Sequence, residues 1–150
     1  MAVALLAFVG ILLASYLTYE HWQIANGGAT SCSVNAVFDC DPVLHSPYAS
    51  VLGIPLAVLG LAGFVAIEIL VLWRFLFIER PVTRVAPLLL AGLCVGGVAL
   101  GTYLTALELF VIHALCPYCV SSFVVMVVLS GVLAWTYWDY GMATLAKVGR

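Results

Sequence analysis

Charged residues are scarce in this sequence of 150 residues. They make up 8% of the chain and hydrophobic residues 65%, whereas about a quarter of an ordinary soluble domain is charged. This composition excludes a typical soluble domain and indicates membrane-spanning segments. The chain has only five lysine and arginine residues, and none of them clusters with exposed aromatic residues, which argues against nucleic-acid binding.

Motifs for metal and haem are also lacking. The five cysteines do not form the closed set of four ligands that a structural zinc site needs. A c-type haem attachment requires a histidine directly after a CxxC pair, and Val120 occupies that position here. We therefore expect no metal site, and the cysteines remain available for disulfide chemistry.

Four apolar runs are long enough to cross a membrane. The expected spans are residues 2–22, 55–77, 85–114 and 117–138. The first run has neither a basic n-region nor a convincing cleavage site, so we expect it to be retained rather than removed as a signal peptide. The sequence thus predicts an all-α bundle of four transmembrane helices, forming a single domain over residues 1–150 without a thioredoxin-like domain.

The segment from about 26 to 53 is polar and irregular, and we expect it to form an external loop between the first two spans. Asn26-Gly27-Gly28 is typical of a left-handed helix end. Val34, Val37 and Phe38 fall at helical spacing. They predict a short amphipathic turn with a cysteine near each end.

Two proline and glycine patterns predict further features of the helices. Ser46 and Pro47 are expected to cap and begin a half-helix, which the Gly53-Ile54-Pro55 break ends before the second span. Glycines in the third span recur at small-xxx-small spacing and favour close helix packing. They are Gly92, Gly96, Gly97 and Gly101.

All the basic residues lie on one side of this four-span topology. They are Arg74, Arg80, Arg84, Lys147 and Arg150. The positive-inside rule makes that side cytoplasmic, so the cysteine pairs face outward, where disulfides can persist. We expect the plasma membrane of a prokaryote, with the active site on the extracytoplasmic face; the alternative is the endoplasmic reticulum membrane.

Two cysteine pairs lie on the outer side. Cys32 and Cys40 share the loop, whereas Cys116 and Cys119 open the last span, with Cys116 as N-cap and Pro117 as the first helical residue. A helix N-terminus favours the thiolate. Thiol–disulfide exchange carries two electrons between such pairs. A membrane quinone is the simplest acceptor next to the helix pair.

Three further residues stand within the spans. Glu68 and Glu108 are membrane carboxylates, which are functional candidates by default. Glu108 lies toward the outer end, where it is a candidate either to protonate a reduced quinone or to pack as a neutral acid. Cys94 is about 33 Å from Cys116 along a helix, which is too far for a disulfide, so we expect it to pack in the core.

Histidines and aspartates near the outer interface offer weaker candidates. His45 and His113 are more readily explained as solvated residues than as proton carriers. Asp39 and Asp41 flank Cys40 and are expected to oppose its thiolate form.

The arrangement of cysteines resembles the vitamin K epoxide reductase family. Cys32, Cys40, Ser46 and then the CPYC pair follow the family's order, and the likeness covers essentially the whole chain. The resemblance implies that Cys116 exchanges with the loop pair through Cys40. It also implies that Cys119 faces the quinone and that Cys32 takes electrons from the partner.

The resemblance also indicates a quinone site and a partner. Ser46 is expected beside the quinone head, and Tyr48, Phe123 and Glu108 are the other candidate contacts. Phe123 stands where the vertebrate enzyme has a tyrosine, and Ala49 stands where it has an asparagine. This favours a bacterial quinone of the menaquinone or ubiquinone type over vitamin K epoxide. The expected partner is a separate extracytoplasmic thioredoxin-fold protein, in support of disulfide-bond formation.

Two other classes stay open. One is a four-span scaffold with structural disulfides only, since closing the Cys32–Cys40 loop contributes about 2.6 kcal/mol by chain entropy. That model gives no reason for a Cys116–Cys119 pair, which closes almost no loop. A thiol-dependent metal transporter is the other class, and the lack of a mid-membrane cysteine or methionine pair weighs against it.

Overall fold

The structure is a computed structural model that describes residues 2–28, 31, 32, 35, 38–51, 53–76 and 86–148, with backbone alone at 75 and 139–148. Its long helices are α1 (Ala2–Ala25), α3 (Leu56–Leu76), α4 (Ala86–Leu107) and α5 (Pro117–Val148). Within the described residues, four helical segments are long and apolar enough to span a membrane. The predicted four-helix membrane bundle is confirmed.

The bundle is held together by contacts of α1 with α3 and α5, and of α4 with α5. Ile67, Leu90 and Leu129 are almost completely buried between the helices. Large apolar side chains also cover the outside of all four helices, as expected where the surrounding solvent is lipid. Contacts between α3 and α4 are sparser, and a cavity lies alongside them.

The glycines of α4 divide into two groups. A Cβ on Gly97 or Gly101 would collide with Met126 or Phe123 of α5, so these two glycines allow the predicted close packing. A Cβ on Gly92 or Gly96 would meet no atom within 4 Å. The packing prediction is therefore wrong for Gly92 and Gly96, which line the cavity instead.

The end of α1 follows the predicted left-handed route. Gly27 has a φ of 81°, and the Gly28 N–H donates to the Gln23 carbonyl at 2.9 Å. The Gly27 N–H donates to the carbonyl of Ile24. These bonds satisfy carbonyl groups that the helix end would otherwise leave without donors.

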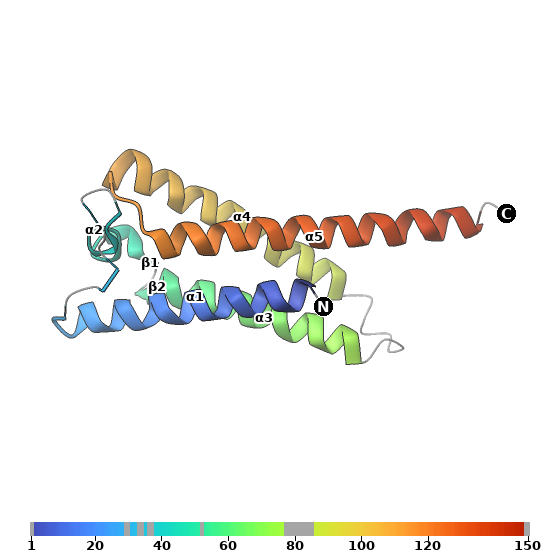
Figure 1. Cartoon of the computed structure of the whole chain (residues 1–150), viewed down its shortest axis with the longest axis horizontal. Helices are drawn as coiled ribbons and strands as arrows, with labels where there is room; N and C mark the ends of the chain where they lie inside the picture. The colour runs from blue at the N-terminus through green and yellow to red at the C-terminus, as the bar shows by residue number, and fades with distance from the viewer. Residues whose placement is uncertain are drawn as a thin grey trace.

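The loop elements gather with the start of α5 at the end of the bundle remote from the N-terminus (Figure 1). The short helix there is α2 (Cys40–Leu44), which begins at the second loop cysteine. The Asp39 carboxylate caps it by accepting the Asp41 N–H at 3.0 Å. Of the predicted turn, Val34 and Val37 lie outside the described residues.

The chain returns to the membrane through a 3-10 turn and a hairpin rather than through the predicted half-helix. The turn η1 (Pro47–Ala49) leads to the antiparallel pair β1 (Ser50–Val51) and β2 (Ile54–Pro55). Gly53 turns the chain with a φ of 80°, a conformation that other residues adopt at a cost.

The C-terminal end of α4 changes from an α-helix to a π-helical turn, η3 (Glu108–Ile112). His113 then takes a left-handed conformation, with a φ of 56°, and ends the helix. The third helical segment therefore stops at Ile112, before the predicted limit at 114. At the other end of the chain, α5 continues past Trp138 to Val148.

Candidate active site

Four cysteines from distant parts of the sequence lie together at the end of the bundle that carries the loop elements. Cys32 and Cys40 form a disulfide, with their Cα atoms 5.8 Å apart. The Sγ of Cys116 lies 3.3 Å from the Sγ of Cys40, and both residues are fully buried. Cys119 follows one helical turn later, so the structure brings both predicted pairs together.

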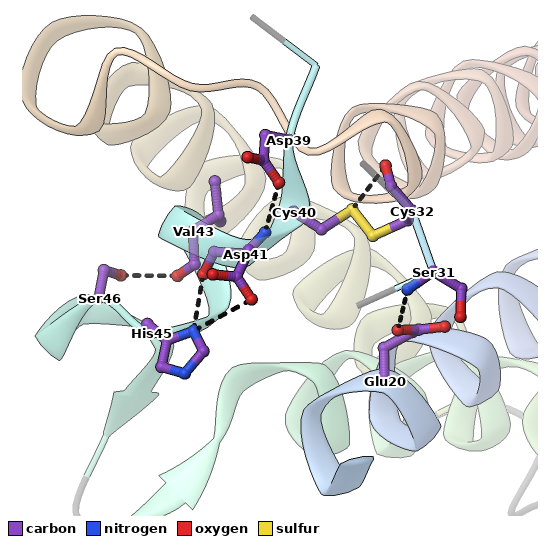
Figure 2. Close-up of polar contacts among 9 residues, drawn as sticks. All are labelled: Glu20, Ser31, Cys32, Asp39, Cys40, Asp41, Val43, His45 and Ser46. Carbon is purple, nitrogen blue, oxygen red and sulfur yellow. Dashed lines mark hydrogen bonds and ion pairs between the residues drawn. A yellow bond between two sulfur atoms is a disulfide. The ribbon is translucent and has the colours of Figure 1, made fainter. Parts of the chain in front are cut away.

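A short backbone link sets this sulfur contact. Phe38 forms an isolated parallel bridge with Leu115, and the Asp39 N–H donates to the Leu115 carbonyl at 3.1 Å. The bridge aligns the residues just before Cys40 with the residue just before Cys116. The Asp39 cap on α2 and the disulfide to Cys32 then fix the direction of Cys40 (Figure 2).

Cys116 occupies the predicted N-cap position of α5. Its carbonyl accepts the Val120 N–H at 3.0 Å, and its sulfur accepts the Cys119 N–H at 3.4 Å. The hydrogen bond from the Cys119 thiol lowers the pKa of Cys116 below that of an ordinary thiol, although burial acts in the opposite direction. Cys116 is therefore the thiol of the pair that more readily becomes a nucleophile or leaves as a thiolate.

Glu108 connects both cysteines of the helix pair. Its side chain is only 2% exposed, and its Oε2 accepts the Cys116 N–H at 3.1 Å. The Cys119 thiol lies within hydrogen-bonding reach of the same carboxyl group. The π-helical turn that begins at Glu108 thus places a carboxyl group between the backbone of one cysteine and the sulfur of the other.

A mostly apolar cavity of about 380 Å³ lies beneath the loop elements, between the helices. The four predicted quinone contacts, Ser46, Tyr48, Phe123 and Glu108, all line it. Cys119 also lines it, whereas Cys32, Cys40 and Cys116 do not. The two cysteines of the helix pair therefore face different surroundings.

Ser46 does not cap η1 with its side chain. It stands at the N-cap position, but its hydroxyl donates to the Val43 carbonyl at 2.8 Å (Figure 2). This bond ties Ser46 to the last turn of α2. The serine therefore positions the loop above the cavity, in addition to lining it.

Glu20 is a site residue that the sequence analysis missed. It is 1% exposed, and its Oε2 accepts the N–H of Ser31, the residue before Cys32, at 3.0 Å (Figure 2). One turn earlier, the ring of Tyr16 contacts that of Tyr118, with centroids 4.6 Å apart. The available signal was a carboxylate close to the end of an apolar run, where a partner is expected.

The remaining candidates lie apart from the sulfur cluster or take other roles. Cys94 is a free cysteine in the bundle core, as predicted. Glu68 does not line the cavity. His113 is exposed, and His45 is exposed beside the Asp41 carboxylate, 3.5 Å away.

A family model for the vitamin K epoxide reductase family matches residues 1–134. The chain belongs to the vitamin K epoxide reductase family. The predicted resemblance is confirmed, and membership makes the chain an integral membrane thiol–disulfide oxidoreductase. Members of this family generally use a quinone as electron acceptor, and the cavity beside Cys119 is the place in this structure to test for one.

The hydrogen bond between the helix cysteines predicts a shift in pH dependence. Cys119→Ala removes the donor that lowers the pKa of Cys116, so that pKa rises. Less Cys116 thiolate is then present at neutral pH, and its attack on the loop disulfide slows. The measurement is the rate at which the Cys32 thiol is released after a pH jump, followed with a maleimide and plotted against pH. The curve for Cys119→Ala should lie at higher pH than the curve for Cys119→Ser, because serine keeps a hydroxyl donor. Superimposable curves for the two variants would show that this bond does not control Cys116.

Proposed function

We propose that the chain oxidises dithiols of a separate thioredoxin-fold protein outside the cytoplasm and passes their electrons through its two cysteine pairs to a membrane quinone. The observation that carries this proposal is the 3.3 Å approach of the Cys116 and Cys40 sulfurs, combined with the exposure of Cys119 to the cavity. Thiol–disulfide exchange requires only that two sulfurs approach each other. The cavity provides space for an electron acceptor next to Cys119.

The first half of the relay moves electrons from the partner to the loop pair and then from the loop pair to the helix pair. One partner thiolate attacks Cys32, so that Cys40 leaves as a thiolate, and the second partner thiol then displaces Cys32 and completes the partner's disulfide. The Cys40 thiolate then attacks Cys116 of an oxidised helix pair, so that a Cys40–Cys116 bond forms and Cys119 leaves as a thiolate. Attack by Cys32 on Cys40 restores the loop disulfide and releases Cys116. The result is the arrangement in this structure, with an oxidised loop pair and two free thiols on α5.

The cavity fits a quinone by size and by lining. Its volume lies within the range of about 300–1,000 Å³ typical of small-molecule sites, and apolar walls surround a few polar groups. Glycines from two helices line the cavity: Gly60 and Gly63 of α3, and Gly92 and Gly96 of α4. A Cβ added to any of them would meet no atom within 4 Å, so the space beside them is open. Such walls accommodate a flat ring and the start of an apolar tail.

The residues expected around the quinone head group have separate roles. A bound quinone accepts two electrons and two protons, as the helix pair returns to a disulfide. Cys119 presents its sulfur to the cavity, and Glu108 holds that thiol and is placed to take its proton. Ser46 and Tyr48 close the cavity from the loop side, and Phe123 forms part of the α5 wall. Phe123 and Ala49 provide no side-chain hydrogen-bond donor, which supports a menaquinone- or ubiquinone-type substrate over vitamin K epoxide.

The proposed setting is a prokaryotic plasma membrane with the cysteines outside. The support for this orientation is the charge pattern, since all lysine and arginine residues fall on the opposite side of the four-span topology.

An introduced thiol tests this orientation. The native loop cysteines are buried, so Ser50→Cys in the exposed hairpin is the better probe. In intact cells an impermeant maleimide should label Ser50→Cys, because that residue faces outward, and should spare Leu76→Cys at the other end of α3. Labelling of Ser50→Cys only after the membrane is opened would reverse the orientation.

Single cysteine replacements should separate the steps of the relay. Cys119→Ser should accumulate a Cys40–Cys116 disulfide, because Cys116 can still attack the loop disulfide at Cys40 but has no neighbour with which to form a disulfide of its own. Cys116→Ser should trap no linkage to the loop, since Cys119 faces the cavity. Mass spectrometry of peptides under non-reducing conditions identifies the linkages, with Cys94→Ser as the control that leaves them unchanged. A dominant Cys32–Cys119 bridge in Cys116→Ser would invert the assignment.

Turnover in liposomes tests the function itself. With a reduced thioredoxin-fold protein and a quinone, the purified chain should form one quinol for each disulfide produced, followed by quinone absorbance. Cys119→Ser should abolish quinol formation, and Cys94→Ser should retain it. Dithiol oxidation that proceeds equally in Cys119→Ser would remove the relay and favour a scaffold with structural disulfides.

A further inference from the structure

Two polar atoms at the cavity have no partner in the part of the chain that the structure describes. The Nδ1 atom of His21 and the Oγ atom of Ser122 are both shielded from solvent and form no hydrogen bond with any described residue. Both residues line the cavity. Buried polar atoms in folded proteins are nearly always paired, because leaving one unpaired costs free energy. A ligand in the cavity is therefore a natural source of the missing partners.

The two residues lie on different walls of the cavity that Cys119 also lines. His21 shares one stripe of α1 with Leu17 and Ala14, which also line the cavity. It stands about 6 Å along the axis from the end of α1 at Ala25. Ser122 follows Cys119 by nearly one turn on the same face of α5, about 7.5 Å from the start of that helix. Since α1 ends and α5 begins at the same end of the bundle, both residues lie within about two helical turns of that end, on the walls of the cavity that Cys119 also lines (Figure 1).

The chemistry of these two groups favours a ligand with acceptor oxygens. An imidazole N–H and a hydroxyl both donate hydrogen bonds, while the carboxyl group of Glu108 is engaged by the Cys116 N–H. The carboxylate of Glu20, next to His21 in sequence, accepts from Ser31 in the loop. A neutral histidine with its proton on Nδ1 thus has a buried donor at the wall of the cavity and no described acceptor.

We propose that His21 donates a hydrogen bond from Nδ1 to a carbonyl oxygen of the bound quinone, and that Ser122 donates a second bond to the same head group. This inference rests on the proposed function and adds the residues that orient the quinone against Cys119. Both bonds strengthen as the oxygens gain negative charge during reduction, because a charged acceptor binds a donor more tightly. His21 and Ser122 thereby affect turnover as well as quinone affinity.

Matched replacements test the proposal. His21→Leu removes the donor at similar size, whereas His21→Asn places an amide N–H near the position of Nδ1. Ser122→Ala removes the second donor. Its control is Ser121→Ala, since Ser121 is exposed and its hydroxyl bonds the Pro117 carbonyl of its own helix. Each variant is assayed for quinone turnover, for quinone binding to the fully oxidised protein, and for thiol exchange between the two cysteine pairs.

The expected results separate quinone contact from a structural role. His21→Leu should weaken quinone binding and lower kcat/KM for quinone by about tenfold or more, as loss of a buried hydrogen bond does. His21→Asn should restore most of both, and Ser122→Ala should show a smaller loss in the same direction. Exchange between the cysteine pairs should stay unchanged in all these variants, and Ser121→Ala should match the wild type throughout.

Other results would overturn the inference in recognisable ways. Wild-type binding and turnover in both His21→Leu and Ser122→Ala would show that these groups do not contact the quinone. Equal impairment of His21→Leu and His21→Asn, with lowered melting temperatures and slowed thiol exchange, would assign His21 a structural role. If the wild-type protein exchanged thiols but reduced no quinone, the proposed function itself would fail, and the inference with it.

Discussion

The contact between Cys40 and Cys116 is the constraint on which the rest of the loop end of the bundle depends. Two buried sulfurs 3.3 Å apart have to be held by backbone, because cysteine side chains are short. The parallel bridge between Phe38 and Leu115 supplies that hold and joins two segments that are far apart in the sequence. The Asp39 cap and the Glu20–Ser31 hydrogen bond tie the loop down on either side of the disulfide. Each satisfies a backbone donor close to the membrane surface, where an unpaired group is costly.

The irregular end of α4 serves the same contact. A π-helical turn widens the helix at Glu108, and the left-handed His113 then redirects the chain toward Cys116. Backbone departures of this kind are frequent at functional sites. Here the departure turns a membrane carboxylate inward, where the Cys116 N–H and the Cys119 thiol surround it. A regular helix continuing to residue 114 would lack both the π-helical turn and the short segment after it that leads to Cys116.

Local patterns in the sequence predict the parts of this protein that depend on local physics. Apolar runs define the four helices, Gly27 ends α1, and Pro117 begins α5, because each follows from hydrophobicity or from the φ angle of one residue. The sequence does not predict features that depend on which segments meet.

Gly92 and Gly97 have the same local pattern, yet α5 covers Gly97 and leaves Gly92 at the cavity. The sequence predicts that Ser46 caps the helical turn that follows it, but its hydroxyl donates to the Val43 carbonyl at the end of α2 instead. Glu20 acquires its role only once the loop folds over α1 and the Ser31 N–H meets its carboxylate. Its position, close to the end of an apolar run, gave no indication of what it would meet.

The one-turn spacing of the CPYC pair explains how a relay can cross from loop to membrane with small movements. At the N-terminus of a helix, side chains one turn apart can face different surroundings. The loop and the cavity meet at the N-terminus of α5. Cys116 is enclosed with the loop disulfide, and Cys119 borders the apolar cavity. A disulfide between Cys116 and Cys119 would therefore link the sulfur that contacts the loop pair to the sulfur that borders the cavity. Under the proposed function, electrons from a soluble dithiol would therefore reach the membrane interior by exchange of sulfur bonds, without a large motion of the helices.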